Sequence, residues 1–335
     1  MKTVDPKWLE RVKKDFANSP LLPSPPDSRD FTLSSVVKAE KPTPRIAKLP
    51  QSPIKIDQGN LPKCAGSAIA GIYNAYYNAI GELPKGGFSD DYAYQRAKQL
   101  DGIPDLDGTY LRIVLMIALH EGICSKAVWD KYKRLCHETI ADAKKYKIKA
   151  YAKLTGLSEI KQAIADGKYL LLGSQVTTDW TKPPTKEDGY IGFPPQGHFV
   201  GGHATYAYGY DDLLRNVRLG YILGENSWGP GWGDDGTYQM PQDFVGYTID
   251  LGMAMLMEVW AVEFPMDVPV VTEREVEMTV GEQEVYLNGE KITIDQSPVV
   301  DKNTWRTMVP IRAIGEMFGF DVKYDEKTKK ITIKG

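Results

Sequence analysis

The sequence predicts an α+β protein with a two-lobed body and a small α+β module at its C-terminal end. Helical patterns come first in the body, at residues 64–81, 89–100 and 109–121, and strand patterns follow from about residue 197 to about residue 265. Helices that precede strands in this way are typical of α+β folds rather than of alternating α/β folds. The last stretch, 276–335, repeats the mixture on a smaller scale.

The helix predicted at 64–81 has the sequence CAGSAIAGIYNAYYNAIG and begins with almost exclusively small residues. Small side chains allow a helix to approach its neighbours closely, so this helix is expected in the middle of the fold. Gly81 suits the residue that follows a helix C-terminus. The later strand patterns are HATYAYGY, VRLGYILGEN, GTYQM and AMLMEVWAVEF.

The C-terminal module, 276–335, follows a Pro-containing linker at 266–275. Its segment VYLNGEKITI places Asn288-Gly289 between alternating stretches, which is a strong hairpin signal. Pro310 suits a helix start, and the helix IRAIGEMF is expected to end at Gly319. FDVKY and ITIKG, joined by a charged turn, predict a second hairpin.

Residues 1–50 are expected to form an N-terminal arm, or short propeptide-like segment. Trp8, Leu9, Val12 and Phe16 have helical spacing, and the stretches that follow are rich in proline, which favours extended chain. Two interpretations remain open: an extension that follows the surface, or an inhibitory segment that lies over an active site.

Composition excludes several classes of protein. The formal net charge is −3, from 41 basic and 44 acidic residues, so no basic excess supports nucleic-acid binding. Three cysteines and four histidines without CxxC or HxxxH spacing predict neither a disulfide framework nor a structural zinc site, and no cofactor is expected.

No apolar run is long enough for a transmembrane helix, and the N-terminus shows no signal-peptide pattern. The compartment stays open. The cytosol or a phage-associated location is expected if the chain is complete, and an extracytoplasmic location if a leader was removed.

One group of residues predicts nucleophilic chemistry. Cys64 begins a helix, where the positive end of the helix dipole favours a thiolate, and Gln58 lies six residues before it. In an antiparallel hairpin, paired residues have a constant index sum. A four-residue loop at 213–216 gives a sum of 429, which places His203 opposite Asn226, although a register slip of one or two residues remains open.

Other residues near this group have structural interpretations. Cys124 and Cys136 are expected to be inert cysteines of the core. Trp228 and Trp232 lie in a glycine-rich loop, where their rings either belong to the core, shield a His–Asn hydrogen bond from water, or do both.

These segments resemble the papain family of cysteine proteases. DQGNLPKCAGSA is similar to its glutamine-to-nucleophile segment, GGHATYAYGYDD to its histidine strand, and GENSWGPGWGDDGTY to its asparagine–tryptophan segment. The interval of 139 residues from position 64 to position 203 fits the roughly 130–150 expected of the family. The resemblance covers residues 51–265.

The resemblance implies a helical lobe bearing Cys64 and a β-barrel-like lobe bearing His203. It also implies that Cys64 is the nucleophile, His203 the general acid and base, and Asn226 the residue that orients the imidazole. Gln58 and the backbone N–H of Cys64 would form the oxyanion hole. Gly202 and Trp228 are assigned to substrate binding.

The sequence departs from the family pattern beside the nucleophile. Pro62-Lys63 stands where Gly-Ser is usual, and Ala65 replaces a bulky aromatic residue. Lys63 either lowers the pKa of the neighbouring thiol or points to solvent, and Pro62 could reshape the loop of the oxyanion donor. Gly202 predicts an open specificity pocket that receives no charge from this position.

The module at 276–335 resembles the small domain named after the N-terminal stalk of copper amine oxidases, most clearly in TMVPIRAIGEMFGFDVKYDEKTKKITI. No histidine or cysteine follows His203, which excludes a copper site with imidazole or thiolate ligands. The module is expected to dock to a surface, a protein partner or the body itself.

The function expected from these features is hydrolysis of protein or peptide substrates by a cysteine endopeptidase. Two alternatives remain open. One is another Cys–His acyl-transfer enzyme that acts on cell-wall peptides, and the other is a catalytically impaired papain-like binding protein.

Overall fold

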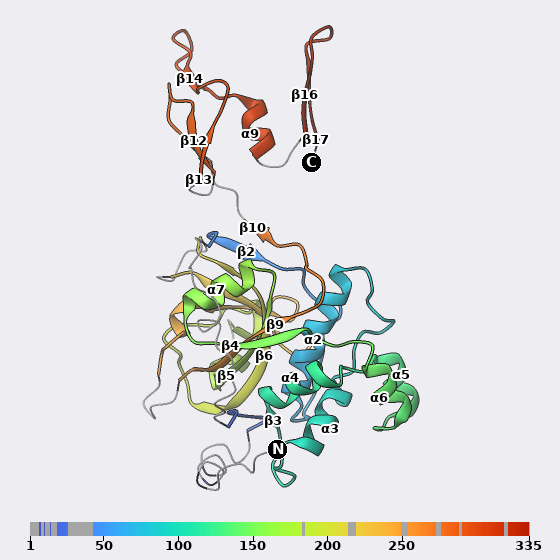
Figure 1. Ribbon diagram of the computed structural model, residues 1–335. Coiled ribbons are helices and arrows are strands. Elements are labelled where there is room, and N and C mark those ends of the chain that lie inside the picture. Colours follow the sequence, from blue (N-terminus) through green and yellow to red (C-terminus); the bar gives the residue numbers. More distant parts are fainter. Residues whose placement is uncertain are drawn as a thin grey trace. The chain divides into compact units, whose positions relative to one another are not determined.

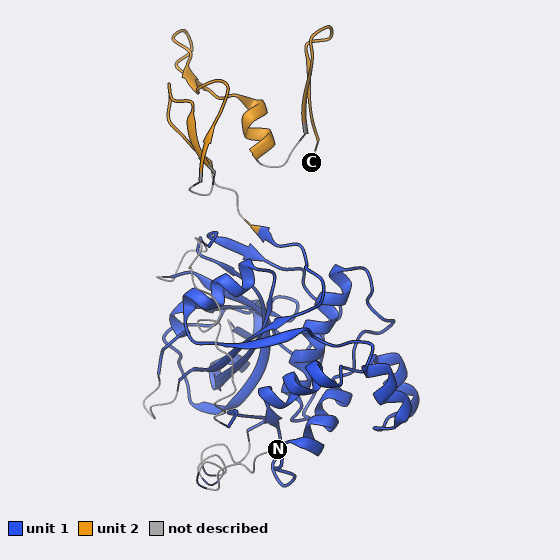
Figure 2. Ribbon diagram, in the orientation of Figure 1, with its two compact units in different colours: residues 1–271 blue, residues 272–335 orange. Residues whose placement is uncertain are grey.

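The chain divides into two compact units, residues 1–271 and residues 272–335 (Figure 2). The computed structural model describes Lys7, Glu10 and Lys14 and the ranges 19–25, 43–182, 185–213, 219–248, 254–272, 276–287, 290–317 and 321–334. Most of the helix predicted around residues 8–16 therefore lies outside the described residues. Within the described ranges, no helix combines the length and apolar character that crossing a bilayer requires.

Residues 64–143 of the larger unit are mainly helical and precede most strands of its sheet, as the sequence predicts (Figure 1). The helices of this region are α2 (Cys64–Ala79), α3 (Asp90–Leu100), α4 (Leu111–His120), α5 (Lys126–Tyr132) and α6 (His137–Ala143). Helix α2 ends where expected, because Ile80 is its C-cap and Gly81 adopts a φ of +73° that glycine tolerates.

The small residues of α2 allow close contact on two sides. A Cβ atom added to Gly66 would lie 2.6 Å from the carbonyl oxygen of Asp90, at the start of α3. One added to Gly71 would lie 2.8 Å from the ring of Tyr206, in the sheet. Since neither position has room for a larger side chain, α2 packs between the helices and the sheet.

An antiparallel sheet forms the other lobe. Its main order is β10-β2-β6-β5-β9-β4, and β7 and β8 extend it from β6. The strands are β2 (Ile46–Lys48), β4 (Ala150–Leu154), β5 (Tyr169–Thr177), β6 (Phe199–Asp211), β7 (Tyr221–Glu225), β8 (Thr237–Pro241), β9 (Leu256–Glu263) and β10 (Val271–Thr272). Helix α7 (Leu157–Ala165), the short α8 (Thr185–Asp188) and two 3₁₀ turns, η2 (Thr178–Thr181) and η3 (Gln242–Phe244), complete this part.

Three of these strands, β2, β4 and β5, precede the region where the sequence analysis begins its strands. Every residue of β5, YLLLGSQVT, is buried, so its pattern lacks the alternation that marks a half-exposed strand. Strand β4 is short and half-buried along most of its length. Within the predicted arm, β2 pairs with β6, opposite Asp211, Tyr210 and Gly209.

The predicted register between His203 and Asn226 is wrong by two to three residues. Tyr206 pairs with Glu225, a sum of 431, and Tyr210 pairs with Ile222, a sum of 432, because the register shifts between Ala207 and Gly209. The connection from β6 to β7 runs from 212 to 220 and is longer than the predicted loop.

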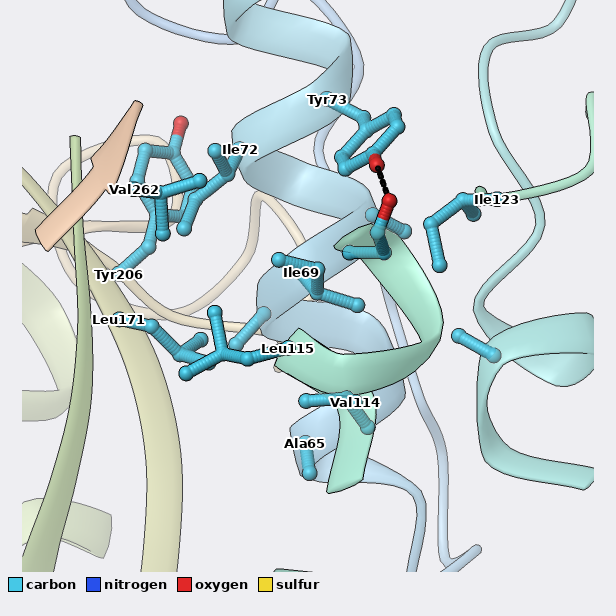
Figure 3. Close-up of a cluster of buried hydrophobic side chains, with 14 of the residues drawn as sticks. Ala65, Ile69, Ile72, Tyr73, Val114, Leu115, Ile123, Leu171, Tyr206 and Val262 are labelled. Atoms are coloured by element: carbon cyan, nitrogen blue, oxygen red, sulfur yellow. Dashed lines mark hydrogen bonds between the residues drawn. The ribbon is translucent and has the colours of Figure 1, made fainter. Parts of the chain in front are cut away.

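Apolar side chains fill both sides of the sheet. Figure 3 shows part of the cluster between α2, α4 and the sheet, where Ile69, Ile72, Leu115 and Leu171 meet. Each is at most 1% exposed, and burial of an aliphatic side chain contributes about 1.5–3 kcal/mol. A second cluster, which includes Trp180, Tyr210 and Trp232, lies under α7 and the loops after β5 and β7. The two clusters fix α2 and β6, which carry the candidate site.

The smaller unit contains the predicted mixture of hairpins and one helix. Its elements are β11 (Val276–Met278), β12 (Glu284–Leu287), β13 (Glu290–Thr293), β14 (Val299–Val300), β15 (Thr307–Met308), α9 (Ile311–Met317), β16 (Asp321–Asp325) and β17 (Lys330–Lys334). Strands β12 and β13 pair in antiparallel fashion, as do β16 and β17. The turn residues Asn288-Gly289 and the expected helix end at Gly319 lie outside the described residues.

Candidate active site

Cys64 is the first residue of α2 and its side chain is fully buried. Its thiol donates a hydrogen bond to the carbonyl oxygen of Pro20 at 3.4 Å. Burial raises the pKa of this thiol to about 12, although the backbone amides of Ala204 and Ala65 act in the opposite direction. The helix start is therefore where the sequence predicts it, but the thiol is neutral because water does not reach it.

His203 lies on β6, immediately before Ala204, and its Nε2 atom is 2.7 Å from Oδ1 of Asn226. The same oxygen accepts the backbone N–H of Ser227 at 2.7 Å. Since Oδ1 can only accept, the proton of the imidazole is assigned to Nε2, which leaves Nδ1 as the basic atom. Burial lowers the pKa of His203 to about 4, and the bond to Asn226 partly offsets this.

Aromatic rings surround this histidine. The centroid of the Trp228 ring lies 4.9 Å from that of His203, and Trp180 contacts the imidazole edge-on at 6.5 Å. Trp232 stacks on Trp180 and donates its indole N–H to the carbonyl of Trp180. The tryptophans therefore belong to the core and also exclude water from the His203–Asn226 bond. Trp180 was not predicted, since it lies outside the recognised motifs.

Gln58 is 6% exposed, and both the oxygen and the nitrogen of its side-chain amide form hydrogen bonds. Its Oε1 accepts the hydroxyl of Ser227 at 2.6 Å, and its Nε2 donates to the carbonyl of Leu61 at 2.8 Å. The backbone N–H of Gln58 donates to the carbonyl of Ser227 at 2.9 Å. The chain before Cys64 is thereby joined to the chain after Asn226, and three of the predicted motifs meet at one place.

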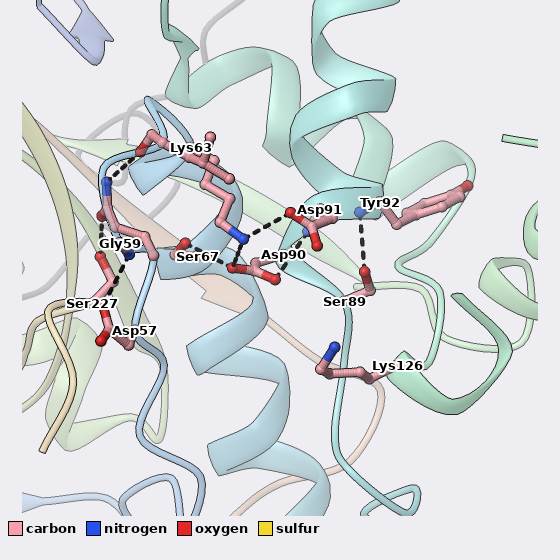
Figure 4. A network of polar contacts seen from close by, with 12 residues as sticks. Asp57, Gly59, Lys63, Ser67, Ser89, Asp90, Asp91, Tyr92, Lys126 and Ser227 are labelled. Atoms are coloured by element: carbon pink, nitrogen blue, oxygen red, sulfur yellow. Dashed lines mark hydrogen bonds and ion pairs between the residues drawn. The ribbon is translucent and has the colours of Figure 1, made fainter. Parts of the chain in front are cut away.

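Lys63 fits neither predicted interpretation. Its Nζ atom lies 2.9 Å from Oδ2 of Asp90 and 2.7 Å from Oδ1 of Asp91, and its side chain is only 9% exposed (Figure 4). Because two carboxylates bind the ammonium, it does not point into solvent. Lys63 is also not among the groups that shift the pKa of Cys64.

Gly202, the residue before His203, contacts the N-terminal segment. Its backbone N–H donates to Oγ of Ser19 at 2.6 Å. A Cβ atom here would lie 2.5 Å from the carbonyl oxygen of Leu21 and 3.0 Å from Cε of Met257. The absence of a side chain at Gly202 is what admits Leu21.

The N-terminal segment 19–25 crosses the site. Strand β1 (Leu21–Leu22) pairs in parallel with β3 (Thr109–Tyr110), and both leucines are fully buried. The Leu21 side chain lies beside Gly173, where a Cβ atom would be 3.1 Å from its Cδ2 atom. A Cβ atom at Gly173 would also lie 3.1 Å from Cγ of Glu258 and 3.3 Å from Cδ1 of Leu111, so these two side chains lie near that of Leu21.

Glu258, on β9, binds the N-terminal segment 19–25 through Ser24. Its Oε1 accepts both the backbone N–H and the hydroxyl of Ser24, at 3.1 and 3.0 Å, and its Oε2 accepts the indole N–H of Trp260 at 2.9 Å. Arg112 donates to the carbonyl of Pro25. Burial raises the pKa of Glu258, and these hydrogen bonds partly offset the shift.

A buried ion pair lies next to the histidine–asparagine pair. Nζ of Lys55 is 2.6 Å from Oε2 of Glu225, whose side chain is 2% exposed. Burial raises the pKa of Glu225 to about 7, although Lys55 acts to lower it. Glu225 precedes Asn226 and ends β7, so this pair anchors the strand that presents the asparagine.

The other two cysteines lie away from these motifs. Cys124 is fully buried, and its Sγ contacts Oδ2 of Asp142 at 3.6 Å. Cys136 is half-buried and caps the start of α6. No cluster of three or more His, Cys, Asp or Glu that could bind a metal occurs among the residues that the structure describes.

The arrangement is suited to acyl transfer. A thiol at a helix start, an imidazole oriented by an amide oxygen, and a glutamine amide fixed in the loop before that helix are the components of a nucleophile, a base and an oxyanion donor.

Comparisons with known proteins agree on the fold. An uncharacterized peptidase C1-like protein of Acanthamoeba polyphaga mimivirus is 26% identical over 219 residues, which cover 60% of this chain and 68% of that protein. The crystal structure of xylellain, a cysteine protease from Xylella fastidiosa, matches with a TM-score of 0.61 and 22% identity over 74% of this chain and 97% of that one. Digestive procathepsin L 3 of Tenebrio molitor matches with a TM-score of 0.54 and 16% identity over 77% and 79%.

The C-terminal part matches a different family. Residues 266–333 match the family model described as the copper amine oxidase N-terminal domain. The donors that copper prefers do not occur there, since the sequence has no histidine or cysteine after His203. The chain thus combines the papain-like cysteine protease fold with a C-terminal domain of the copper amine oxidase N-terminal type.

Proposed function

We propose that this chain is a cysteine endopeptidase with Cys64 as nucleophile and His203 as its base. The observation that carries the proposal is the 2.7 Å contact between Nε2 of His203 and Oδ1 of Asn226. The residue after His203 on the same strand, Ala204, directs its backbone amide at the Cys64 thiol. The mimivirus relative, named peptidase C1-like, supports the same class of reaction.

In the proposed reaction, Nδ1 of His203 takes the proton of Cys64. The sulfur then attacks the carbonyl carbon of the peptide bond, and the carbonyl oxygen becomes negatively charged. As the C–N bond breaks, the imidazolium returns its proton to the leaving amine, and a thioester remains on Cys64. Water, deprotonated by His203, hydrolyses the thioester and regenerates the thiol.

Gln58 and the backbone N–H of Cys64 are proposed to stabilise the oxyanion. One amide hydrogen of Gln58 binds the carbonyl of Leu61, and the other is available for the substrate oxygen. The Ser227 hydroxyl on Oε1 orients the amide so that its NH₂ group faces away from Ser227. A donor fixed before the reaction is more effective than one that must reorient during it.

We assign substrate binding to Gly202 and Trp228. The carbonyl oxygen of Leu21 lies beside Gly202 and the side chain of Leu21 lies beside Gly173, which favours uncharged aliphatic residues at the neighbouring subsite. Glu258 adds a buried carboxylate to the same pocket, from β9 rather than from position 202. Cleavage of a peptide library only at acidic or only at basic residues would overturn this assignment.

The N-terminal segment is proposed to inhibit the enzyme. The carbonyl oxygen of Pro20 accepts the hydrogen bond of the Cys64 thiol and Leu21 is buried directly after it, so a substrate must displace both. The Pro20 contact adds to the burial that keeps the Cys64 thiol neutral. This favours the inhibitory interpretation of the arm over a surface extension.

For the C-terminal module we propose docking to a surface or a protein partner. Two other functions stay as alternatives for the body: acyl transfer on cell-wall peptides, and binding without catalysis. Under either alternative the chain would not hydrolyse an ordinary protein substrate such as casein.

The test is hydrolysis of casein or a fluorogenic peptide before and after an epoxide-type thiol inhibitor. We expect hydrolysis that the inhibitor abolishes, with the label on Cys64, and no hydrolysis by Cys64→Ala. Cys136→Ser serves as the control, because it removes a half-buried thiol outside the site and should change neither readout. Hydrolysis that persists in Cys64→Ala would refute the proposed mechanism. Labelling of Cys64 without hydrolysis would favour the binding protein.

A further inference from the structure

Lys63 connects the loop before the nucleophile to two helices. It is the N-cap residue of α2, and its ammonium binds the carboxylates of the first two residues of α3, Asp90 and Asp91. Oδ2 of Asp90 also accepts the hydroxyl of Ser67, from the first turn of α2, at 3.2 Å. Figure 4 shows the ammonium between the two aspartates.

The aspartates are themselves fixed. Ser89 caps α3 by accepting the backbone N–H of Tyr92 at 3.1 Å, and the N–H of Asp91 donates to Oδ1 of Asp90 at 3.0 Å. The close packing of α2 on α3 at Gly66 leaves little freedom between the two helices. Lys63 is therefore attached to a rigid base.

The loop attached to Lys63 carries the proposed oxyanion donors. The N–H of Lys63 donates to the carbonyl of Leu61 at 2.8 Å, and the same carbonyl accepts Nε2 of Gln58 at 2.8 Å. Leu61 itself is 55% exposed, so its side chain does little to fix the loop. A shift of Lys63 would be transmitted through the Leu61 carbonyl to the amide of Gln58, and directly to the N–H of Cys64.

We infer that Lys63, with Asp90 and Asp91, is a positioning unit for the oxyanion donors of Gln58 and Cys64. The inference rests on the proposed peptidase function and goes beyond it, because Lys63 touches neither substrate nor thiol. Its charge is neutralised by the two carboxylates, so it acts through geometry rather than by ionising Cys64. Misplacement of a catalytic donor by about 1 Å can cost a hundredfold in rate.

The experiment compares peptide hydrolysis with iodoacetamide alkylation of Cys64 in the full chain. Alkylation forms a C–S bond as iodide leaves, so it requires the thiolate but no oxyanion donor. For Lys63→Met we expect kcat to fall at least about tenfold, with KM and the alkylation rate within about twofold of wild type. Asp91→Asn should have a smaller effect in the same direction, and Lys63→Arg should restore most of kcat.

The matched control is Lys149→Met, which breaks an exposed ion pair between Lys149 and Glu263. It should leave kcat unchanged. All variants are measured with and without Leu21→Asp, so that cover by the N-terminal segment does not hide an effect. Kinetics of Lys63→Met equal to wild type, or alkylation that falls in parallel with kcat, would overturn the inference. If wild type and all variants alkylate but none hydrolyses, the proposed function fails instead.

Discussion

The thiol of Cys64 donates its hydrogen bond to the carbonyl oxygen of Pro20, 3.4 Å away. Pro20 lies 44 positions earlier in the chain, and the leucine that follows it places its carbonyl oxygen beside Gly202 and its side chain beside Gly173. A thiol that donates to a carbonyl is held in its neutral form, and the carbonyl stands where a substrate would approach the sulfur. The contact therefore links the candidate nucleophile to the N-terminal segment 19–25, which buries it.

Replacing Leu21 by Asp should release the N-terminal segment. An aspartate at this buried position would place a second carboxylate near the buried Glu258 and the aliphatic side chain of Leu111, and an unpaired buried charge costs several kcal/mol. We expect the full chain with Leu21→Asp to hydrolyse a fluorogenic peptide at least about tenfold faster than wild type. Initial rates at equal enzyme concentration measure the effect.

The matched control is Leu219→Asp, at a leucine that is 38% exposed in the loop before β7. It should leave the rate unchanged. Equal rates for wild type and Leu21→Asp would show that the segment does not limit access to the site.

The pH dependence of the Cys64 alkylation rate should show that the thiol is neutral while the N-terminal segment buries it. Burial raises the pKa of Cys64 to about 12 and lowers that of His203 to about 4, so the thiol is neutral and no imidazolium assists it at neutral pH. In wild type, the iodoacetamide rate should rise about tenfold per unit between roughly pH 6 and 9. A rate that is constant over this range would instead indicate a thiolate–imidazolium pair in the covered chain.

Asn226→Ala should lower kcat and leave KM nearly unchanged. Without Oδ1, both the Nε2 proton of His203 and the N–H of Ser227 lose their acceptor, and the imidazole is free to rotate on β6. We expect a loss of about tenfold to a hundredfold, measured by steady-state kinetics in the Leu21→Asp background. Asn226→Gln, which keeps the amide oxygen, should recover part of the loss. A change confined to KM would argue against an orienting role.

Lys55→Met should destabilise the fold. It removes the partner of the buried Glu225, and breaking one side of a buried pair costs about 3–5 kcal/mol. The folded pKa of Glu225, about 7, lies above its ordinary value of 4.5, so its protonation favours folding at low pH, and this contribution is lost as pH rises through 7. The destabilisation should therefore be larger at pH 8 than at pH 5. Urea unfolding at the two pH values measures it, and an equal loss at both would contradict the raised pKa.

The sequence predicts local features of this site better than distant contacts. The central position of the helix that begins at Cys64 follows from its small residues and its end from Gly81, and the contact of His203 with Asn226 follows from two adjacent strands. The register between these strands was wrong because the connection from β6 to β7, residues 212–220, is longer than the four-residue loop that the sequence analysis assumes. The side-chain contact survives the error, since it forms beyond the last paired residues, Tyr206 and Glu225.

Contacts between segments that are distant in the sequence could not be predicted from the sequence patterns. Lys63 looks like a surface charge until α3 places Asp90 and Asp91 beside it, and Glu258 looks like an ordinary strand residue until Ser24 lies above it. Strand β5 escaped recognition because burial on both faces removes its alternation. Each case depends on tertiary packing, which local patterns do not encode.

The most direct test is to trap the acyl-enzyme. The full chain with Leu21→Asp is mixed with a peptide ester, quenched in acid during turnover and digested, and the fragment that contains Cys64 is weighed by mass spectrometry. The proposed mechanism predicts the mass of the acyl group on Cys64, and no adduct in Cys64→Ala, which should also be inactive. Hydrolysis at an undiminished rate in Cys64→Ala would contradict it.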